Sequence, residues 1–212
     1  MPMTSQRILL YFADPMCSWC WGFSPVINSI KNRYSSRLDI SLMLGGLRPG
    51  PTEPMTKTSR EEILDHWRAV HRMTGQPFAF DGAMPEGFIY DPEPPSRAVI
   101  AVGDIHPEAI FPYFKSVQEA FYARGLNVTQ ADTLANLAKD HRVEKTEFLE
   151  RFNSEEIRHN TQSHFQGTHP SGVRGFPTVV LQKETHGTLL THGYRSFEDL
   201  QPAIDKWLAP AE

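Results

Sequence analysis

The chain has 212 residues, of which 40% are hydrophobic and 11% are aromatic. This is the composition of a folded protein, and the length suffices for one core or for a main domain with a smaller one. The formal net charge of −4 lacks the basic excess that a nucleic-acid backbone or an anionic membrane surface attracts. We therefore expect neither a nucleic-acid partner nor a membrane partner.

The hydropathy pattern excludes a membrane span. No apolar stretch approaches the ~20 residues that a helix needs to cross a bilayer. The first apolar run is also too short for a signal peptide, whose apolar region holds ~7–15 residues. We therefore expect a cytoplasmic protein.

The first elements follow a strand–helix–strand pattern. Ile8–Ala13 is a continuous apolar run, which is typical of a strand buried on both faces. A helix is expected to begin at Cys17, because apolar residues recur from there at helical spacing as far as Tyr34. Residues 38–44 then alternate as in a second strand. Two strands joined by a helix predict a parallel βαβ unit.

The only two cysteines, Cys17 and Cys20, lie at the start of this expected helix. There the unpaired N–H groups and the helix dipole stabilise a thiolate at the first sulfur, and the second sulfur is placed to resolve a mixed disulfide. Two other interpretations are half of a zinc site and two buried apolar residues. Zinc would have to recruit the distant His164 and His169, since no second CxxC exists. In a cytoplasmic protein an isolated CxxC is more often catalytic, redox-sensing or metal-binding than structural.

Residues 49–167 carry helical patterns and no convincing strand. Ser59-Arg60-Glu61-Glu62 has the pattern of a capping box, which predicts a helix beginning there. Pro77–Pro95 is expected to be a long ordered loop, and a further helix is expected to begin near Ser96. No linker-like stretch appears, so we interpret this region as an insertion and not as a separately hinged domain.

The last region returns to strands. Phe176–Leu181 predicts one strand, and the turn residues Lys183–Gly187 lead to a second at Thr188–His192. Ser196 is expected to cap a final helix.

Three segments resemble the DsbA-like family of thioredoxin-fold proteins, in particular the bacterial group of protein-disulfide isomerases and DsbA-like oxidoreductases. The segments are Asp14–Phe23 with its Cys17-Ser18-Trp19-Cys20 motif, Gly45–Gly50 and Gly175–Thr178. The resemblance implies an α/β thioredoxin-like fold, with a βαβ unit, a β-hairpin and a C-terminal helix, that carries a large all-helical insertion. Residues 1–48 and 168–212 would form the thioredoxin-like domain, and residues 49–167 the inserted helical domain.

The resemblance also implies roles for individual residues. Cys17 would attack the substrate, Cys20 would resolve the mixed disulfide, and Pro177 would follow a cis peptide bond whose flanking backbone pairs with an extended peptide. We also expect Trp19, exposed between the cysteines, and Phe176 to form an apolar rim for substrate. The redox-active disulfide Cys17–Cys20 carries the electrons, so no metal or organic cofactor is expected.

Two departures from the family pattern bear on the redox direction. Ser18-Trp19 replaces the Pro-His pair of strongly oxidising DsbA proteins, and the first strand holds no acid, which leaves Asp14 as the nearest candidate proton acceptor. A cytosolic glutathione poise favours the dithiol form, and hence reductase or isomerase activity over net oxidation. The expected partners are protein or peptide thiols and disulfides, with glutathione as a co-substrate or a thioredoxin-type protein as reductant.

Two alternative functions stay open. Kappa-type glutathione transferases and 2-hydroxychromene-2-carboxylate isomerases share the core and the insertion, and they use glutathione without a second cysteine. A redox-insensitive peptide-binding chaperone would use the aromatic rim and the insertion. The first alternative predicts that Cys20→Ser keeps its activity, whereas a dithiol exchanger would stall at mixed disulfides. The second alternative predicts that holdase activity survives Cys17→Ser.

Overall fold

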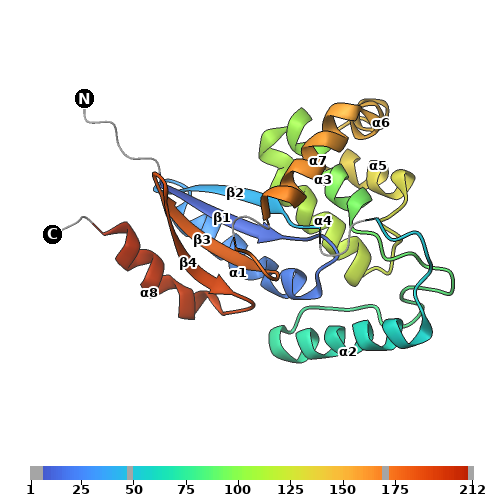
Figure 1. The fold of residues 1–212 in the computed structure, drawn as a ribbon, viewed down its shortest axis with the longest axis horizontal. Helices are drawn as coiled ribbons and strands as arrows, with labels where there is room; N and C mark the ends of the chain where they lie inside the picture. Colours follow the sequence, from blue (N-terminus) through green and yellow to red (C-terminus); the bar gives the residue numbers. More distant parts are fainter. Residues whose placement is uncertain (1–6, 47–49, 169–171, 210–212) are drawn as a thin grey trace.

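A computed structural model describes residues 7–46, 50–168 and 172–209 of the chain. Four strands form one mixed sheet in the order β2-β1-β3-β4, and helices occupy the interval between β2 and β3 (Figure 1). The elements are β1 (Arg7–Ala13), α1 (Ser18–Tyr34), β2 (Asp39–Leu44), α2 (Lys57–Thr74), α3 (Glu93–Ile105), the 3₁₀ turn η1 (Pro107–Ala109), α4 (Ile110–Tyr122), α5 (Ala131–Lys139), α6 (Lys145–Asn153), α7 (Glu155–Thr168), β3 (Thr178–Lys183), β4 (His186–His192) and α8 (Phe197–Leu208). This order and pairing confirm the α/β thioredoxin-like fold with a helical insertion.

The predicted βαβ unit is present, with β1 parallel to β2 and α1 between them in the chain. Leu9, Tyr11 and Ala13 alternate along β1 on one face of the sheet and are fully buried there. Ile8 and Leu10, on the opposite face, are only half-buried. The expectation that both faces of β1 are buried was therefore correct for one face and only partly correct for the other.

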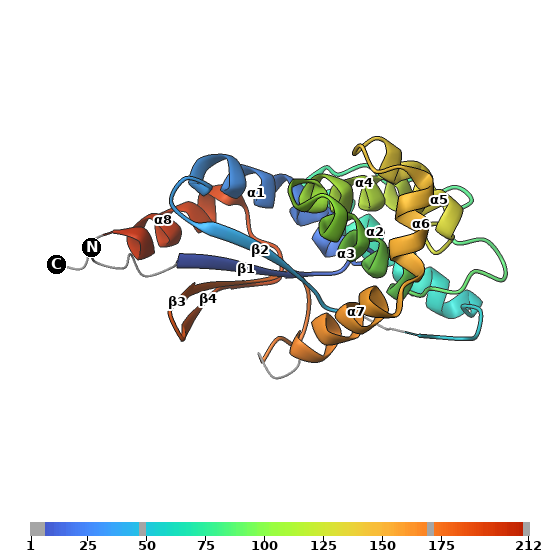
Figure 2. The ribbon, with the colours of Figure 1, turned by 90° about the horizontal axis from the view of Figure 1, so that it is seen from above.

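The coverage of the sheet explains this asymmetry. Helices α1 and α8 lie together on one side of the sheet, whereas α7 lies on the other side beside β2 (Figure 2). The second face of β1 is therefore only partly covered.

The hairpin of β3 and β4 is antiparallel, and β3 also pairs with β1. The first strand begins at Thr178, later than the expected Phe176, because Pro177 has no N–H to contribute to the ladder and follows a cis peptide bond. The second strand begins at His186, two residues before the expected Thr188.

Side-chain caps set two helix starts. The Ser196 hydroxyl accepts a hydrogen bond from the Asp199 N–H at 3.2 Å, which confirms the predicted cap of α8. The predicted capping box at Ser59 was wrong in register. Thr56 is the cap of α2, and its hydroxyl accepts the Ser59 N–H at 3.1 Å, so the helix begins at Lys57.

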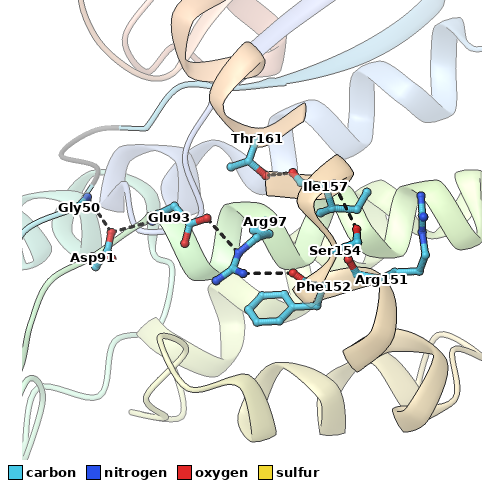
Figure 3. A network of polar contacts seen from close by, with 9 residues as sticks. All are labelled: Gly50, Asp91, Glu93, Arg97, Arg151, Phe152, Ser154, Ile157 and Thr161. Atoms are coloured by element: carbon cyan, nitrogen blue, oxygen red, sulfur yellow. Dashed lines mark hydrogen bonds and ion pairs between the residues drawn. The ribbon is translucent and has the colours of Figure 1, made fainter. Parts of the chain in front are cut away.

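A network of polar contacts ties the segment after β2 to the helices (Figure 3). The Asp91 carboxylate accepts the N–H groups of Gly50 at 3.1 Å and Glu93 at 3.0 Å. Arg97 forms an ion pair with Glu93 at 2.9 Å and donates to the Phe152 carbonyl at 3.1 Å. The network therefore joins the start of α3 to the end of α6.

In the part of the chain that the structure describes, each helix is too short or too polar to cross a lipid bilayer. The division into a thioredoxin-like domain and an inserted helical domain stays a prediction.

Candidate active site

Cys17 occupies the N-cap of α1. The Cys17 N–H donates to the Asp14 carbonyl at 3.1 Å, and the Cys17 carbonyl accepts the Trp21 N–H at 3.1 Å, so a tight turn leads directly into the helix. The Cys17 side chain makes no capping hydrogen bond to the helix. Its sulfur thus lies at the end of the helix where free N–H groups and the helix dipole favour negative charge.

Cys20 lies one turn further along the same helix and is fully buried, whereas Cys17 keeps 6% of its surface exposed. Both cysteines are free thiols. Burial raises the pKa of the Cys20 thiol well above its usual value, and the neighbouring Cys17 thiol raises it further. Cys17 is therefore the thiol that an external group reaches first.

The loop before β3 comes from the other end of the chain and contacts the thiol. The peptide bond between Phe176 and Pro177 is cis, and the Cys17 thiol donates to the Phe176 carbonyl at a sulfur–oxygen distance of 3.5 Å. The loop is held by the Pro177 carbonyl, which accepts the Gly193 N–H at 2.7 Å. The structure thus brings both loop residues named from the sequence beside the first cysteine.

A cavity of about 290 Å³ opens beside Cys17. Its walls come from four parts of the chain: the start of α1 with the residues just before it, the cis-proline loop, helix α2 and the loop before α3. The lining residues are Met16, Cys17, Ser18, Trp19, Ile63, His66, Tyr90, Gly175 and Phe176.

Trp19 differs from its expected state. The sequence predicts an exposed side chain, but Trp19 is half-buried, because its ring lies 6.3 Å from the Tyr194 ring in the segment before α8. Trp19 still forms part of the cavity wall together with Phe176.

Sequence reasoning missed the contribution of α2 to this cavity. Ile63 and His66 are three residues apart and therefore lie on neighbouring turns of one helix face. The helical pattern identified Ile63 as apolar, but no local signal shows which part of the fold that face approaches. Tyr90 was also missed, and its hydroxyl donates a hydrogen bond to the Met16 carbonyl, just before the first cysteine.

A proline in α1 provides a second link between the site and the segment after α2. Pro25 has no N–H, so the Trp21 carbonyl lacks its usual partner in the helix. The Gln76 side-chain amide donates to that carbonyl at 3.0 Å, and the Trp21 indole N–H donates to the Pro77 carbonyl at 3.0 Å. The first turns of α1 are therefore anchored by the segment that follows α2.

Asp14, the candidate proton acceptor, is fully buried, and its carboxylate accepts the Met16 N–H at 2.7 Å. Its backbone lowers the pKa of Cys20 by hydrogen bonding, and its negative charge opposes that effect. Asp14 therefore lies close to the resolving thiol, and its role in proton transfer stays a prediction.

The structure gives no support to the zinc interpretation. His164 Nδ1 accepts the Leu44 N–H at 3.2 Å, and His169 lies outside the described residues. Within residues 7–46, 50–168 and 172–209, His, Cys, Asp and Glu form no group of three or more that is placed to bind a metal ion.

Comparisons with known proteins agree with this geometry. Residues 8–205 match the DSBA-like thioredoxin domain family. A candidate protein disulfide isomerase from Nitrosomonas europaea is 44% identical and superposes with a TM-score of 0.91, over 96% of this chain and 98% of that one. The cytosolic disulfide reductase DsbM from Pseudomonas aeruginosa, in a structure with GSH, is 26% identical with a TM-score of 0.78, over 95% of this chain and 98% of that one.

A more distant relative carries a different description. The ClpXP adapter protein SpxH of Halalkalibacterium halodurans is 25% identical over 174 residues, which are 80% of this chain and 56% of that protein. The chain spans less than two thirds of the length of the curated relatives that it matches.

Proposed function

Because the chain belongs to the DSBA-like thioredoxin domain family, we propose that it is a thiol–disulfide oxidoreductase in which Cys17 and Cys20 exchange disulfides with protein or peptide substrates. The observation that carries this proposal is the asymmetry of the two thiols. Cys17 lines a cavity at a helix N-terminus, and Cys20 is sealed one turn behind it. Such a pair attacks an external disulfide with one sulfur and releases the product with the other.

The proposed reduction has two steps. The Cys17 thiolate attacks one sulfur of the substrate disulfide, a mixed disulfide forms, and the other substrate sulfur leaves as a thiolate that takes up a proton. Cys20 then loses its proton and attacks the Cys17 sulfur, which releases the second substrate sulfur as a thiol. Two electrons pass from the dithiol to the substrate, and the Cys17–Cys20 disulfide is reduced again by two equivalents of a thiol such as glutathione or by a thioredoxin-type dithiol.

The substrate would bind across the cavity and the cis-proline loop. A volume of about 290 Å³ is just below the range for small-molecule pockets, ~300–1,000 Å³, and suits a small thiol or a few residues of an extended peptide. Trp19 and Phe176 supply apolar surface, and the backbone beside Pro177 would pair with the peptide. The DsbM structure with GSH supports glutathione as one such thiol.

We favour reduction or isomerisation over net oxidation, in the cytoplasm. The cytosolic description of the DsbM neighbour supports this compartment. A cytosolic glutathione pool keeps most dithiols reduced. A reduction potential near that of DsbA, about −120 mV, measured for Cys17–Cys20 against glutathione, would contradict the preferred direction.

Disulfide reduction in insulin, assayed with glutathione as donor, tests the proposal. Cys17→Ser removes the attacking sulfur and is expected to abolish turnover. Cys20→Ser is expected to stall the protein as a mixed disulfide at Cys17, which mass spectrometry detects. Undiminished glutathione-dependent isomerase or transferase activity in Cys20→Ser would favour that alternative, and holdase activity that survives Cys17→Ser without any insulin reduction would favour the chaperone.

A further inference from the structure

Tyr11 lies on β1, on the face of the sheet that packs against α1. Its side chain is fully buried, with the ring 5.6 Å from that of Phe23 in α1 and 6.3 Å from that of Phe114 in α4. The Tyr11 hydroxyl is enclosed, yet it makes no conventional hydrogen bond within the described part of the chain. Such an unpaired buried hydroxyl is uncommon, because a buried polar group without a hydrogen-bond partner lowers the stability of the folded state.

The polar groups that act on this hydroxyl are the two thiols. Burial raises the pKa of Tyr11 well above its usual value, and the charge of Cys20, the charge of Cys17 and the closeness of the Cys20 thiol to the hydroxyl raise it further. The raised pKa keeps the phenol protonated at neutral pH, so its hydroxyl is available there as a hydrogen-bond donor.

Other charged and polar groups also act on the Cys20 thiol and on the Cys17 thiol beside it. The Asp14 backbone favours the Cys20 thiolate by hydrogen bonding, while the Asp14 carboxylate and the Cys17 sulfur oppose it. From α4, the buried Tyr122 interacts with Tyr90 and with the charge of Cys17. Of these groups, the Asp14 backbone is the one that favours negative charge on Cys20.

We propose that the Tyr11 hydroxyl donates a hydrogen bond to the Cys20 thiolate and thereby accelerates the resolving step. This inference rests on the proposed dithiol function. In that step Cys20 gives up its proton, its sulfur forms a bond to the Cys17 sulfur, and the substrate sulfur leaves Cys17 and takes up one proton. Tyr11 keeps its own proton throughout, so the atoms and electrons balance without it.

The donor is effective because the acceptor changes during the reaction. A neutral thiol or a disulfide is a weak acceptor, whereas a thiolate accepts a charge-assisted bond of roughly twice the strength of a neutral one. Tyr11 thus favours the ionised intermediate over both the resting dithiol and the disulfide. Removing the hydroxyl alone, in Tyr11→Phe, relieves an unpaired buried group, so we expect the unfolding temperature to stay the same or to rise.

The first test titrates Cys20 without any substrate. The thiolate absorbance of Cys17→Ser is compared with that of Cys17→Ser combined with Tyr11→Phe. The Cys20 pKa is expected to rise by about one unit, a tenfold smaller thiolate fraction at neutral pH. Tyr34→Phe is the matched control, because Tyr34 is a buried tyrosine at the far end of α1 whose hydroxyl donates to Asp205 at 2.8 Å. An unchanged titration in the Tyr11→Phe protein overturns the proposal.

The second test follows the full chain through the resolving step. A mixed disulfide is formed at Cys17, and its resolution is measured against pH. Tyr11→Phe is expected to slow resolution about threefold at neutral pH, because a tenfold loss of thiolate is partly offset by the greater nucleophilicity of the more basic thiolate. At alkaline pH, where Cys20 is ionised in both proteins, the variant is expected to be no slower than the wild type. A purely structural role would slow the step equally at every pH, which contradicts the proposal. If the wild-type chain resolves no mixed disulfide, the proposed function fails, and the titration still decides the role of Tyr11.

Discussion

Gly45 shows how tightly the residues beside the thiol are packed. A Cβ atom at this position would lie 1.8 Å from Cζ of the Phe176 ring, and two other ring atoms would be within 2.6 Å. The absence of a side chain at Gly45 therefore lets Phe176 lie where its carbonyl accepts the Cys17 thiol. The glycine pair Gly45-Gly46 marked a turn in the sequence, but the ring that requires the first glycine is more than a hundred residues away.

We expect Gly45→Ala to displace the Phe176 ring and the loop that carries it. Overpacking of this kind costs ~1–3 kcal/mol of unfolding free energy, which chemical denaturation measures. The rate of Cys17 alkylation should change as well, because the Phe176 carbonyl moves relative to the sulfur. Gly167→Ala in α7 is the control. Its Cβ would meet only Met43 Cε at 3.7 Å, an ordinary contact, so stability and alkylation rate should be unchanged or stability slightly higher. Equal behaviour of the two variants would contradict the packing argument.

The residues of the site differ in how far sequence could identify them. Cys17 and Cys20 lie in one short motif with its strand and helix, so local patterns suffice. Phe176 and Pro177 were found through resemblance, since nothing in their own neighbourhood indicates a partner at Cys17. His66 and the unpaired hydroxyl of Tyr11 depend on tertiary packing alone, which single-sequence periodicity does not encode.

At the level of elements, α7 is attached to β2 through a histidine. His164 Nδ1 accepts the Leu44 N–H at 3.2 Å, and burial lowers the pKa of His164 below its usual value. The folded state therefore holds this ring neutral. Protonation at Nδ1 removes the acceptor at the end of the strand that leads to Gly45.

This contact predicts a loss of stability in acid. In the unfolded chain a histidine has a pKa of about 6.5, so around and below that pH the unfolded state binds more protons than the folded state, whose His164 pKa is lower. The unfolding free energy should then fall with falling pH, by at most about 1.4 kcal/mol per pH unit for one site and by less here, because the ring is only partly buried. His164→Asn keeps an acceptor near Nδ1 and does not titrate, so denaturation measured from neutral to mildly acidic pH should show a shallower slope.

Another histidine on the same helix provides the comparison. His159 is exposed to solvent, and His159→Asn should leave the wild-type slope unchanged. A wild-type slope in the His164→Asn protein would show that this contact does not set the acid sensitivity.

Element boundaries were less predictable than the elements themselves. The helix α2 was expected from its apolar face, but its cap is Thr56 and not Ser59, since both residues have a hydroxyl and only the folded backbone decides which one accepts the N–H. Likewise α3 begins at Glu93, three residues before the expected Ser96, because prolines are tolerated in a first helical turn. Such choices depend on where neighbouring elements hold the chain.

At the scale of the whole molecule, the helices and the sheet share one core. Helix α1 contacts both α2 and α4, and α7 contacts β2. The aromatic ring of Trp21 in α1 also stacks on Tyr122 in α4, with ring centroids 6.3 Å apart. No linker-like stretch flanks the insertion in the sequence, and these contacts are consistent with that pattern. We therefore expect the chain to unfold in a single cooperative transition.

A substitution at Arg97, which lies far from the two cysteines in the sequence, tests this expectation. Its guanidinium is almost fully buried, pairs with Glu93 at 2.9 Å and lies 4.0 Å from the centre of the Phe152 ring. Arg97→Met leaves the Glu93 carboxylate and the Phe152 carbonyl without this partner. Breaking a buried pair costs ~3–5 kcal/mol, and we expect the lower end because a quarter of the Glu93 side chain is exposed.

Chemical denaturation of Arg97→Met, followed by circular dichroism and by Cys20 reactivity, shows whether the insertion shares one core with the sheet or unfolds as a separate domain. If there is one shared core, both signals shift together to a lower denaturant concentration. The double variant Glu93→Gln with Arg97→Met is expected to recover part of the lost unfolding free energy, because the unpaired charge is gone. The folded variant should keep the wild-type redox potential, since Arg97 contacts neither cysteine. An early circular-dichroism transition during which Cys20 stays protected would mean that residues 49–167 unfold on their own, and the helical insertion would then be a separate domain that the redox site does not need for its stability.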